Sequence, residues 1–142
     1  MGVRGVERLN QPWEDQRAQR VSAAVGDLRK LLAPGETVQV LGPPGGHVLL
    51  RLRLRQPTRF FTDFQFYIWT DDPRIQALRA EFMTGLAAHP PAAIVAFPGR
   101  HANGPYGRLT EFPALSQLLE RRYAIAVEGN GYRIYTKRSG IL

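Results

Sequence analysis

The residues most suited to chemistry are four arginines in a single short segment, Arg51, Arg53, Arg55 and Arg59. The planar guanidinium group of arginine suits phosphate and carboxylate, to which it can donate two parallel hydrogen bonds. Leucines alternate with the first three arginines, so the segment must bury one side while it holds charge on another. We expect any function of the chain to involve this region, with Arg51, Arg55 and Arg59 as candidate anion-binding residues.

A turn rich in glycine and proline precedes the arginines and reads Gly42-Pro43-Pro44-Gly45-Gly46. It lacks the Lys-Ser/Thr ending of a phosphate-binding loop, and its prolines remove backbone N–H donors that such a loop needs. We therefore interpret Gly42, Gly45 and Gly46 as structural residues of a tight turn between a strand and a helix. Pro57 anchors a second turn, in which we expect Arg59 to tie loops together more than to contact a ligand.

Six aromatic residues follow the arginines: Phe60, Phe61, Phe64, Phe66, Tyr67 and Trp69. Aromatic rings beside basic residues can stack on nucleic-acid bases or on sugar rings, whereas most such clusters only fill a core. The core interpretation is favoured, with Phe60, Phe64 and Phe66 beneath a sheet. Phe61 and Tyr67 are the candidates for a ligand face. Two or more exposed rings beside Arg55 or Arg59 would indicate a binding platform.

The usual catalytic and metal-binding patterns are weak. The three histidines, His47, His89 and His101, lie far apart in the sequence and lack metal-ligand spacing. The chain has no cysteine, which excludes thiolate zinc sites and cysteine nucleophiles. Asp71-Asp72 precedes Pro73 and is best explained as a helix cap. The sequence therefore predicts no catalytic residue, no metal site and no cofactor.

Composition is that of one folded domain. The chain has 142 residues, 44% of them apolar and 22% charged, and a net charge of +7 that arginine dominates. No apolar run approaches the roughly 20 residues that cross a bilayer, and the N-terminus lacks the apolar stretch of a signal peptide. Most of the arginines are expected to be solvated surface residues. Their charge still makes nucleic acid, anionic lipid and phosphorylated ligands conceivable partners.

Hydrophobic periodicity predicts alternating helices and strands. Residues 1–11 are expected to be a leader or linker, and residues 12–142 a single α/β domain. We expect helices packed on a small mixed sheet that ends in a C-terminal β-hairpin. The expected helices are residues 12–33, 72–89 and 113–122, and the expected strands are 37–41, 92–97, 123–127 and 132–136. The continuous apolar run at 92–97 favours a central strand, and residues 98–111 should form a polar loop.

Residues 48–55 give conflicting signals. Leucine and arginine alternate over Leu50–Arg55, which is the pattern of a half-buried strand. Both residue types are also good helix formers, and a glycine-rich turn after a strand commonly opens a helix. We favour the helix, in which Val48, Leu49 and Leu52 would pack on the sheet.

The order of these motifs resembles a known group over about residues 15–138. The motifs are a helix ending in Pro34-Gly35, a strand reaching Gly42, the segment Pro57-Thr58-Arg59-Phe60, Pro90-Pro91 before a strand, and the closing Gly131-Tyr132-Arg133-Ile134-Tyr135. Together they resemble the soluble C-terminal domain of bacterial polytopic glycosyltransferases of the dolichyl-phosphate-mannose protein mannosyltransferase type. The chain departs from that group at Pro43 and Leu50, where aromatic residues are frequent in the group.

The resemblance implies a domain that is not catalytic alone, because the catalytic acidic residue of such enzymes lies in a loop between transmembrane helices. It implies a place on the extracytoplasmic, periplasmic face of the bacterial inner membrane. There the domain would cap the membrane-embedded part of the same or a neighbouring protein, or orient the acceptor, near anionic lipid or the lipid-phosphate sugar. The alternative is a free-standing, cytoplasmic basic module that binds nucleic acid or another polyanion, with nucleic acid the less favoured partner.

Overall fold

Two short apolar strands form the centre of the fold. In the computed structural model, which describes residues 2–139 and the side chains of residues 15–139, every residue of β1 (Val38–Leu41) and β2 (Ala93–Ala96) is buried. The two strands pair in parallel, with Val38 opposite Ala93. Burial on both faces explains the continuous apolar run of β2, whereas β1 contains one buried polar residue, Gln39.

A β-hairpin completes the sheet. β3 (Tyr123–Gly129) and β4 (Tyr132–Lys137) pair antiparallel, and β4 also pairs antiparallel with β2. The strand order is therefore β1-β2-β4-β3, a mixed sheet in which β2 is central. A β-bulge between Ile125 and Val127 interrupts the β3–β4 pairing.

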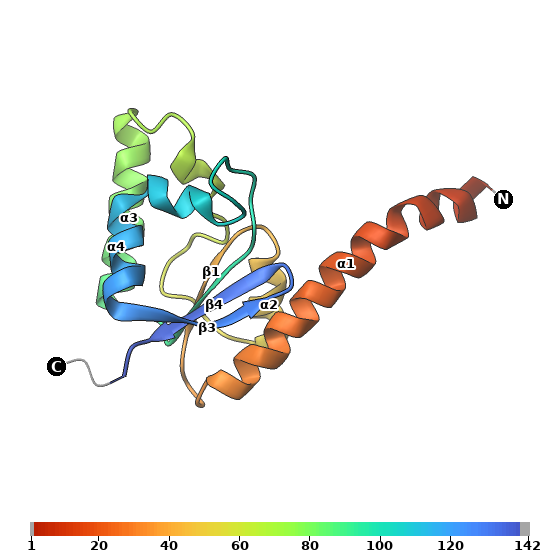
Figure 1. Ribbon diagram of the computed structural model, residues 1–142, viewed down its shortest axis with the longest axis horizontal. Helices are drawn as coiled ribbons and strands as arrows, with labels where there is room; N and C mark the ends of the chain where they lie inside the picture. Colours follow the sequence, from red (N-terminus) through yellow and green to blue (C-terminus); the bar gives the residue numbers. More distant parts are fainter. Residues whose placement is uncertain (1, 140–142) are drawn as a thin grey trace.

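Helices cover both faces of this sheet (Figure 1). α1 (Gly2–Leu31) and α2 (Gly45–Leu52) pack on one face, and α3 (Pro73–Ala88) and α4 (Pro113–Arg122) pack on the other. Two 3-10 turns, η1 (Phe64–Tyr67) and η2 (Gly107–Glu111), add to the second layer. The α/β class, the mixed sheet and the C-terminal hairpin expected from the sequence are confirmed.

The alternation of β2 divides the core into two clusters. Ala93 and Val95 face the α1/α2 layer, where the other apolar residues are mostly aliphatic. Ile94 and Ala96 face the α3/α4 layer, which is rich in phenylalanine. The aromatic cluster includes edge-to-face contacts, with ring centroids 5.1 Å apart for Phe60–Phe66 and 5.4 Å for Phe66–Phe112.

The structure resolves the ambiguity at residues 48–55 in favour of the helix. α2 buries Val48 and Leu49 against the α1/α2 layer, with Leu52 partly buried beside them. The helix stops at Leu52 because Arg53 adopts a left-handed conformation, with φ of 54°, and its N–H bonds to the carbonyls of Leu49 and Leu50.

Several segments differ from the predicted ones. The first helix begins at Gly2 and not at Pro12, so the segment predicted as a leader or linker has a helical backbone from Gly2 onward. The loop predicted at 98–111 contains the 3-10 turn η2. β3 and β4 extend the hairpin strands to Gly129 and Lys137.

The outer edge of β1 is covered by the segment that follows α2. The buried Gln39 amide donates to the Phe60 carbonyl at 3.1 Å, and the Thr58 hydroxyl donates to Gln39 Oε1 at 2.8 Å. Gln56 Oε1 accepts the N–H of Val40 at 3.4 Å. These bonds occupy donors and acceptors along an edge strand and hold residues 56–60 in place.

Candidate functional site

The glycine–proline turn has the geometry of a tight link between β1 and α2. Gly42 has φ of 117°, a conformation that favours glycine, and the N–H of Gly45 bonds to its carbonyl at 3.0 Å. A Cβ at Gly45 would lie 2.4 Å from the Cβ of Val40, whereas one at Gly46 would meet open space. The need for glycine is therefore evident at positions 42 and 45 but not at 46.

The three candidate arginines lie in different surroundings. Arg51 is exposed and donates to the Ser22 hydroxyl at 2.7 Å. Arg55 is exposed, and no hydrogen bond or ion pair of its side chain occurs within residues 15–139. Arg59 is exposed and bidentate to Glu81, at 2.6 Å and 3.0 Å. Hydrogen bonding within this pair raises the pKa of Arg59 and lowers that of Glu81.

The turn that carries Arg59 is fixed to α3. A Cβ at Gly85 would approach Thr58 Cγ2 to 2.9 Å and the Pro57 carbonyl oxygen to 3.3 Å, so Pro57 and Thr58 pack tightly on α3 at this glycine. Arg59 also lies over the Phe60 ring, 4.6 Å from its centroid. The Pro57 turn therefore joins the 56–60 segment to α3.

The aromatic residues divide between core and surface. Phe60 and Phe66 are buried, but Phe64 is 68% exposed, so its predicted place in the core is wrong. Phe61 and Trp69 are 58% and 78% exposed. Three rings of the six therefore face solvent, and of these Phe61 shares a surface groove with Arg55.

Tyr67 lies in a different environment from the one expected of a ligand face. Its ring is partly buried against the core, beside a buried ion pair between Asp63 and Arg108. Burial is the largest cause that raises the pKa of Tyr67 above its ordinary value. Arg79 lies over its ring, 5.8 Å from the centroid. The structure therefore separates Tyr67 from the exposed rings.

A groove of about 510 Å³ lies between α2 and the chain that follows it. Leu50 and Phe61 line it and are both mostly exposed, while Arg53 and Arg55 stand at the same groove. No Asp or Glu lines it. We call this feature, with Leu50, Arg53, Arg55 and Phe61, the α2 groove.

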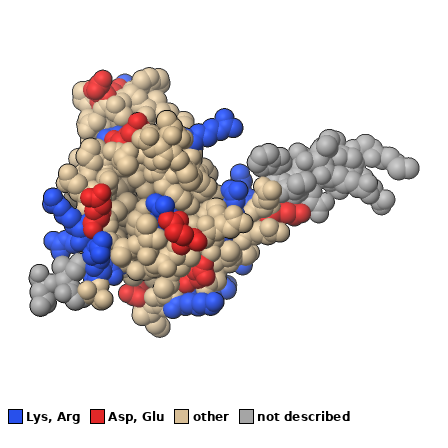
Figure 2. All heavy atoms as spheres, viewed as in Figure 1, with Lys and Arg blue, Asp and Glu red and all other residues tan. Residues whose placement is uncertain are grey.

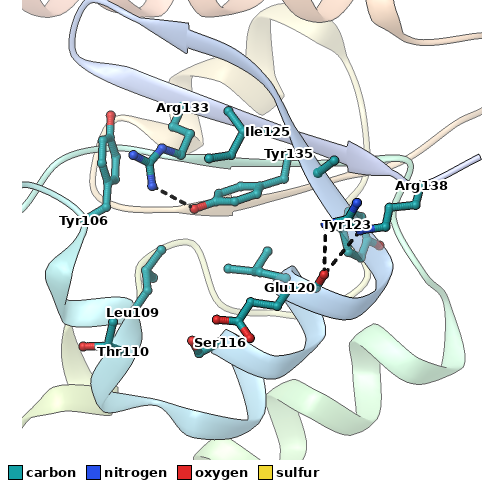
Figure 3. A pocket seen from close by; sticks show the side chains of 12 residues that line it. Tyr106, Leu109, Thr110, Ser116, Glu120, Tyr123, Ile125, Arg133, Tyr135 and Arg138 are labelled. Atoms are coloured by element: carbon teal, nitrogen blue, oxygen red, sulfur yellow. Dashed lines mark hydrogen bonds between the residues drawn. The ribbon is translucent and has the colours of Figure 1, made fainter.

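A second groove, which the sequence did not indicate, lies between α4, η2 and the hairpin (Figure 3). Its volume is about 360 Å³, and Arg133 of β4 lies on one side between the rings of Tyr106 and Tyr135. The guanidinium group is 4.2 Å from the Tyr106 centroid, donates to the Tyr135 hydroxyl at 3.1 Å and pairs with Glu128 at 2.6 Å. Its buried Nε has no hydrogen-bond partner within the described residues.

One sequence signal could have pointed to Arg133. Tyr132 and Ile134 belong to the α1/α2 core, so alternation along β4 places Arg133 on the same face as the buried Tyr135. An arginine at an inward-facing strand position needs partners. Tyr106 supplies one of them from a distant loop, and no spacing in the sequence reveals that contact.

One histidine, His101, has side-chain and backbone partners that hold it in place. His101 contacts Glu111 at 3.2 Å, and its Nδ1 accepts the N–H of Asn103, which accounts for this residue structurally. Within the residues that the structure describes, no three His, Asp or Glu side chains are placed to hold a metal ion. No helix in the described part of the chain combines the length and the apolar character needed to cross a bilayer.

Comparisons of the chain with protein-family models, with curated proteins and with solved structures found no match. The resemblance drawn from the order of motifs therefore stays a prediction. The contacts and exposed surfaces of this chain are what bear on its function.

Proposed function

We propose that the chain is a non-catalytic domain that binds an anionic membrane surface beside a membrane-embedded glycosyltransferase using lipid-phosphate-linked sugars. The observation that carries this proposal is a concentration of exposed apolar side chains in one part of the chain. Of the six large apolar side chains exposed within residues 15–139, four lie between residues 50 and 69: Leu50, Phe61, Phe64 and Trp69. Two of them, Leu50 and Phe61, line the α2 groove together, and exposed apolar side chains that share one patch mark an interaction site.

The arginines beside Leu50 and Phe61 suggest the nature of the partner. Arg53 and Arg55 line the α2 groove together with Leu50 and Phe61, and no carboxylate lines it. Apolar side chains that enter a bilayer interface and cations that meet its anionic headgroups are the combination used by peripheral membrane proteins. Each well-placed cation contributes about 1 kcal/mol at such a surface.

Trp69 supports the same interpretation. Its backbone is left-handed, with φ of 50°, and its indole is 78% exposed. A left-handed conformation costs a residue other than glycine roughly 1–2 kcal/mol, and burial of the side chain does not offset that cost here. Tryptophan is enriched where proteins meet the membrane–water interface. A strained backbone that presents an exposed indole is therefore consistent with membrane contact.

The glycosyltransferase part of the proposal rests on the motif order and on what those motifs do. Pro57-Thr58-Arg59-Phe60, the closest match to the group, lies along the edge of β1 and joins it to α3. Its residues bond to Gln39 and Glu81 or fill the core. The motif therefore has a structural role, as expected for a domain whose catalytic residue lies elsewhere. This part is tested by reading the coding sequence that flanks the chain for a frame that encodes many apolar spans.

The membrane part is tested by sedimentation with vesicles of phosphatidylglycerol and phosphatidylcholine. We expect the chain to sediment with the anionic vesicles and not with phosphatidylcholine alone. Phe61→Ser, Trp69→Ser and Arg55→Gln should each weaken this binding. Ile125→Ser and Arg100→Gln are the matched controls, because they remove an exposed apolar side chain and an exposed charge from other parts of the chain.

Two results would contradict the membrane proposal. One is vesicle binding that the control variants weaken as much as Phe61→Ser, Trp69→Ser and Arg55→Gln do. The other is tight, salt-dependent binding of random oligonucleotides with no vesicle binding, which would favour the polyanion-binding alternative.

A further inference from the structure

A cluster of basic residues lies where α4 and β4 end, away from the α2 groove. Figure 2 shows basic side chains gathered at the lower left, near the place where Figure 1 draws the C-terminal end of the chain. Arg122 ends α4, and the N–H of Arg138 bonds to the Arg122 carbonyl at 2.9 Å. Lys137 lies opposite Tyr123 in the β3–β4 pairing. Backbone pairing thus brings these three basic residues to one place.

No acidic side chain within residues 15–139 forms an ion pair with this cluster. Arg122, Lys137 and Arg138 are exposed, as is the adjacent Arg121, and none of the ion pairs within residues 15–139 includes any of them. Arg138 donates through Nε and Nη2 to the Glu120 carbonyl, at 3.3 Å and 3.1 Å. The carbonyl end of α4 carries about half an elementary negative charge, which offsets only a small part of four positive charges.

A hollow of about 530 Å³ opens between these side chains and the ends of α3 and α4. Arg122, Lys137 and Arg138 line it together with a set of apolar residues, and no Asp or Glu does so. The apolar residues are Leu86, Ala87, Pro90 and Leu118, with the Tyr123 ring. The hollow therefore combines an apolar wall with three cations, and its volume lies in the range of small-molecule sites.

We propose that this hollow binds a phosphate ester, with the phosphate on Arg122, Lys137 and Arg138 and the organic group against the apolar wall. A phosphate carries up to two negative charges and three strong acceptor oxygens, so it can accept from all three side chains together. Guanidinium groups match its geometry in a bidentate manner. This site uses none of the residues of the α2 groove, so it does not depend on the proposed function.

The test uses the whole chain labelled with ¹⁵N and titrated at low salt with phenyl phosphate, inorganic phosphate and phenol. Phenyl phosphate should shift the amide signals of residues 121–123 and 136–138, inorganic phosphate should do so more weakly, and phenol should not. Vesicles that contain phosphatidic acid form a fourth arm, because a lipid headgroup offers the same phosphate chemistry. Vesicle binding that Arg122→Gln/Lys137→Gln weakens, without binding of phenyl phosphate, would assign the phosphate to a lipid.

The double variant Arg122→Gln/Lys137→Gln should weaken phenyl phosphate binding by about tenfold or more. Arg29→Gln/Lys30→Gln is the matched control, since it removes the same two residue types from the exposed last turn of α1 and should leave the binding unchanged. Equal weakening in both double variants would overturn the proposal, as would the absence of shifts with every phosphate probe at about 10 mM. Retained binding of anionic vesicles by Arg122→Gln/Lys137→Gln would show that the α2 groove acts independently.

Discussion

The arginines of two regions differ in how far they are buried and in the partners that hold their guanidinium groups. In the α3/α4 layer, Arg79, Arg108 and Arg133 are enclosed, and each has fixed acceptors and an adjacent aromatic ring or carboxylate. On the α2 side, Arg51 and Arg55 are exposed, and Arg51 bonds to a serine hydroxyl. The first group is bound into the fold, whereas the second is free to meet a partner.

This difference teaches that the density of arginine in a segment is a poor guide to its role. Burial of a guanidinium group is costly unless acceptors surround it, so an enclosed arginine is committed to structure. An exposed arginine contributes little to the stability of the fold, and its N–H donors can bind a ligand. Substitutions in the two regions should therefore have opposite consequences for stability and for binding.

The largest effect is expected for Arg108→Ala. Arg108 and Asp63 form an ion pair at 2.8 Å with side chains only 11% and 3% exposed, so removal of the cation leaves a buried carboxylate. We expect a loss of about 3–5 kcal/mol in the free energy of unfolding, measured by urea denaturation. Arg100→Ala, which truncates an exposed arginine nearby in the sequence, should change stability little. Equal stability of the two variants would contradict the division between enclosed and exposed arginines.

A smaller effect is expected for Arg79→Met. Arg79 donates from Nε and Nη2 to the Phe66 carbonyl, at 2.9 Å and 2.6 Å, and lies 4.5 Å from the Phe112 centroid. Methionine keeps most of the apolar stem but removes the charged donors, so we expect a loss of about 1.5–3 kcal/mol. The same substitution at the exposed Arg121 is the control in thermal melting.

Two buried tyrosines should make the stability of the fold depend on pH in the alkaline range. Burial raises the pKa of Tyr123 to about 12, and burial together with the hydrogen bond to Asp27 raises that of Tyr132 to about 12. The neutral phenols therefore stabilise the fold fully below the unfolded pKa of about 10, and this contribution is lost as pH rises through 12. Absorbance of phenolate at alkaline pH should show the late ionisation, and Tyr123→Phe should remove one late-ionising group.

The smallest effect is expected for Arg59→Ala. Its ion pair with Glu81 joins the Pro57 turn to α3, but both side chains are largely exposed, so we expect a small decrease in melting temperature. Glu81→Ala should have a similar effect, and the double variant should add little to either single one. Unchanged melting of Arg59→Ala would show that the pair does not tie the turn to the helix.

The sequence predicted the elements whose hydrophobic pattern is local. The apolar run of β2, the turn that opens α2 and the Asp72 cap of α3, whose side chain accepts the N–H of Arg74 at 2.8 Å, all follow from neighbouring residues. Phe64 was assigned to the core together with Phe60 and Phe66 because most aromatic clusters of this kind fill a core. Phe64 and Phe66 lie in a 3-10 turn, which has three residues per turn, so their side chains point in different directions.

The grooves were harder to predict because residues far apart in the chain form them. Arg53 and Arg55 meet Phe61 only because α2 ends at Leu52 and the chain then returns along β1. Arg133 meets Tyr106 across the α3/α4 layer, and Arg108 meets Asp63 from a segment 45 positions away. Exposure and contacts between distant residues determine the roles of these side chains, and the local spacing of residues predicts neither.

The direct junction of α4 and β3 has a consequence for how this protein can vary. α4 ends at Arg122 and β3 starts at Tyr123, with no connecting residue between them. Since side chains alternate along a strand, a single residue inserted here would turn Tyr123 outward and Ala124 inward and would displace the rest of β3 in the same way. Length changes in natural or engineered variants should therefore be tolerated at the Asn130 turn and rejected at this junction.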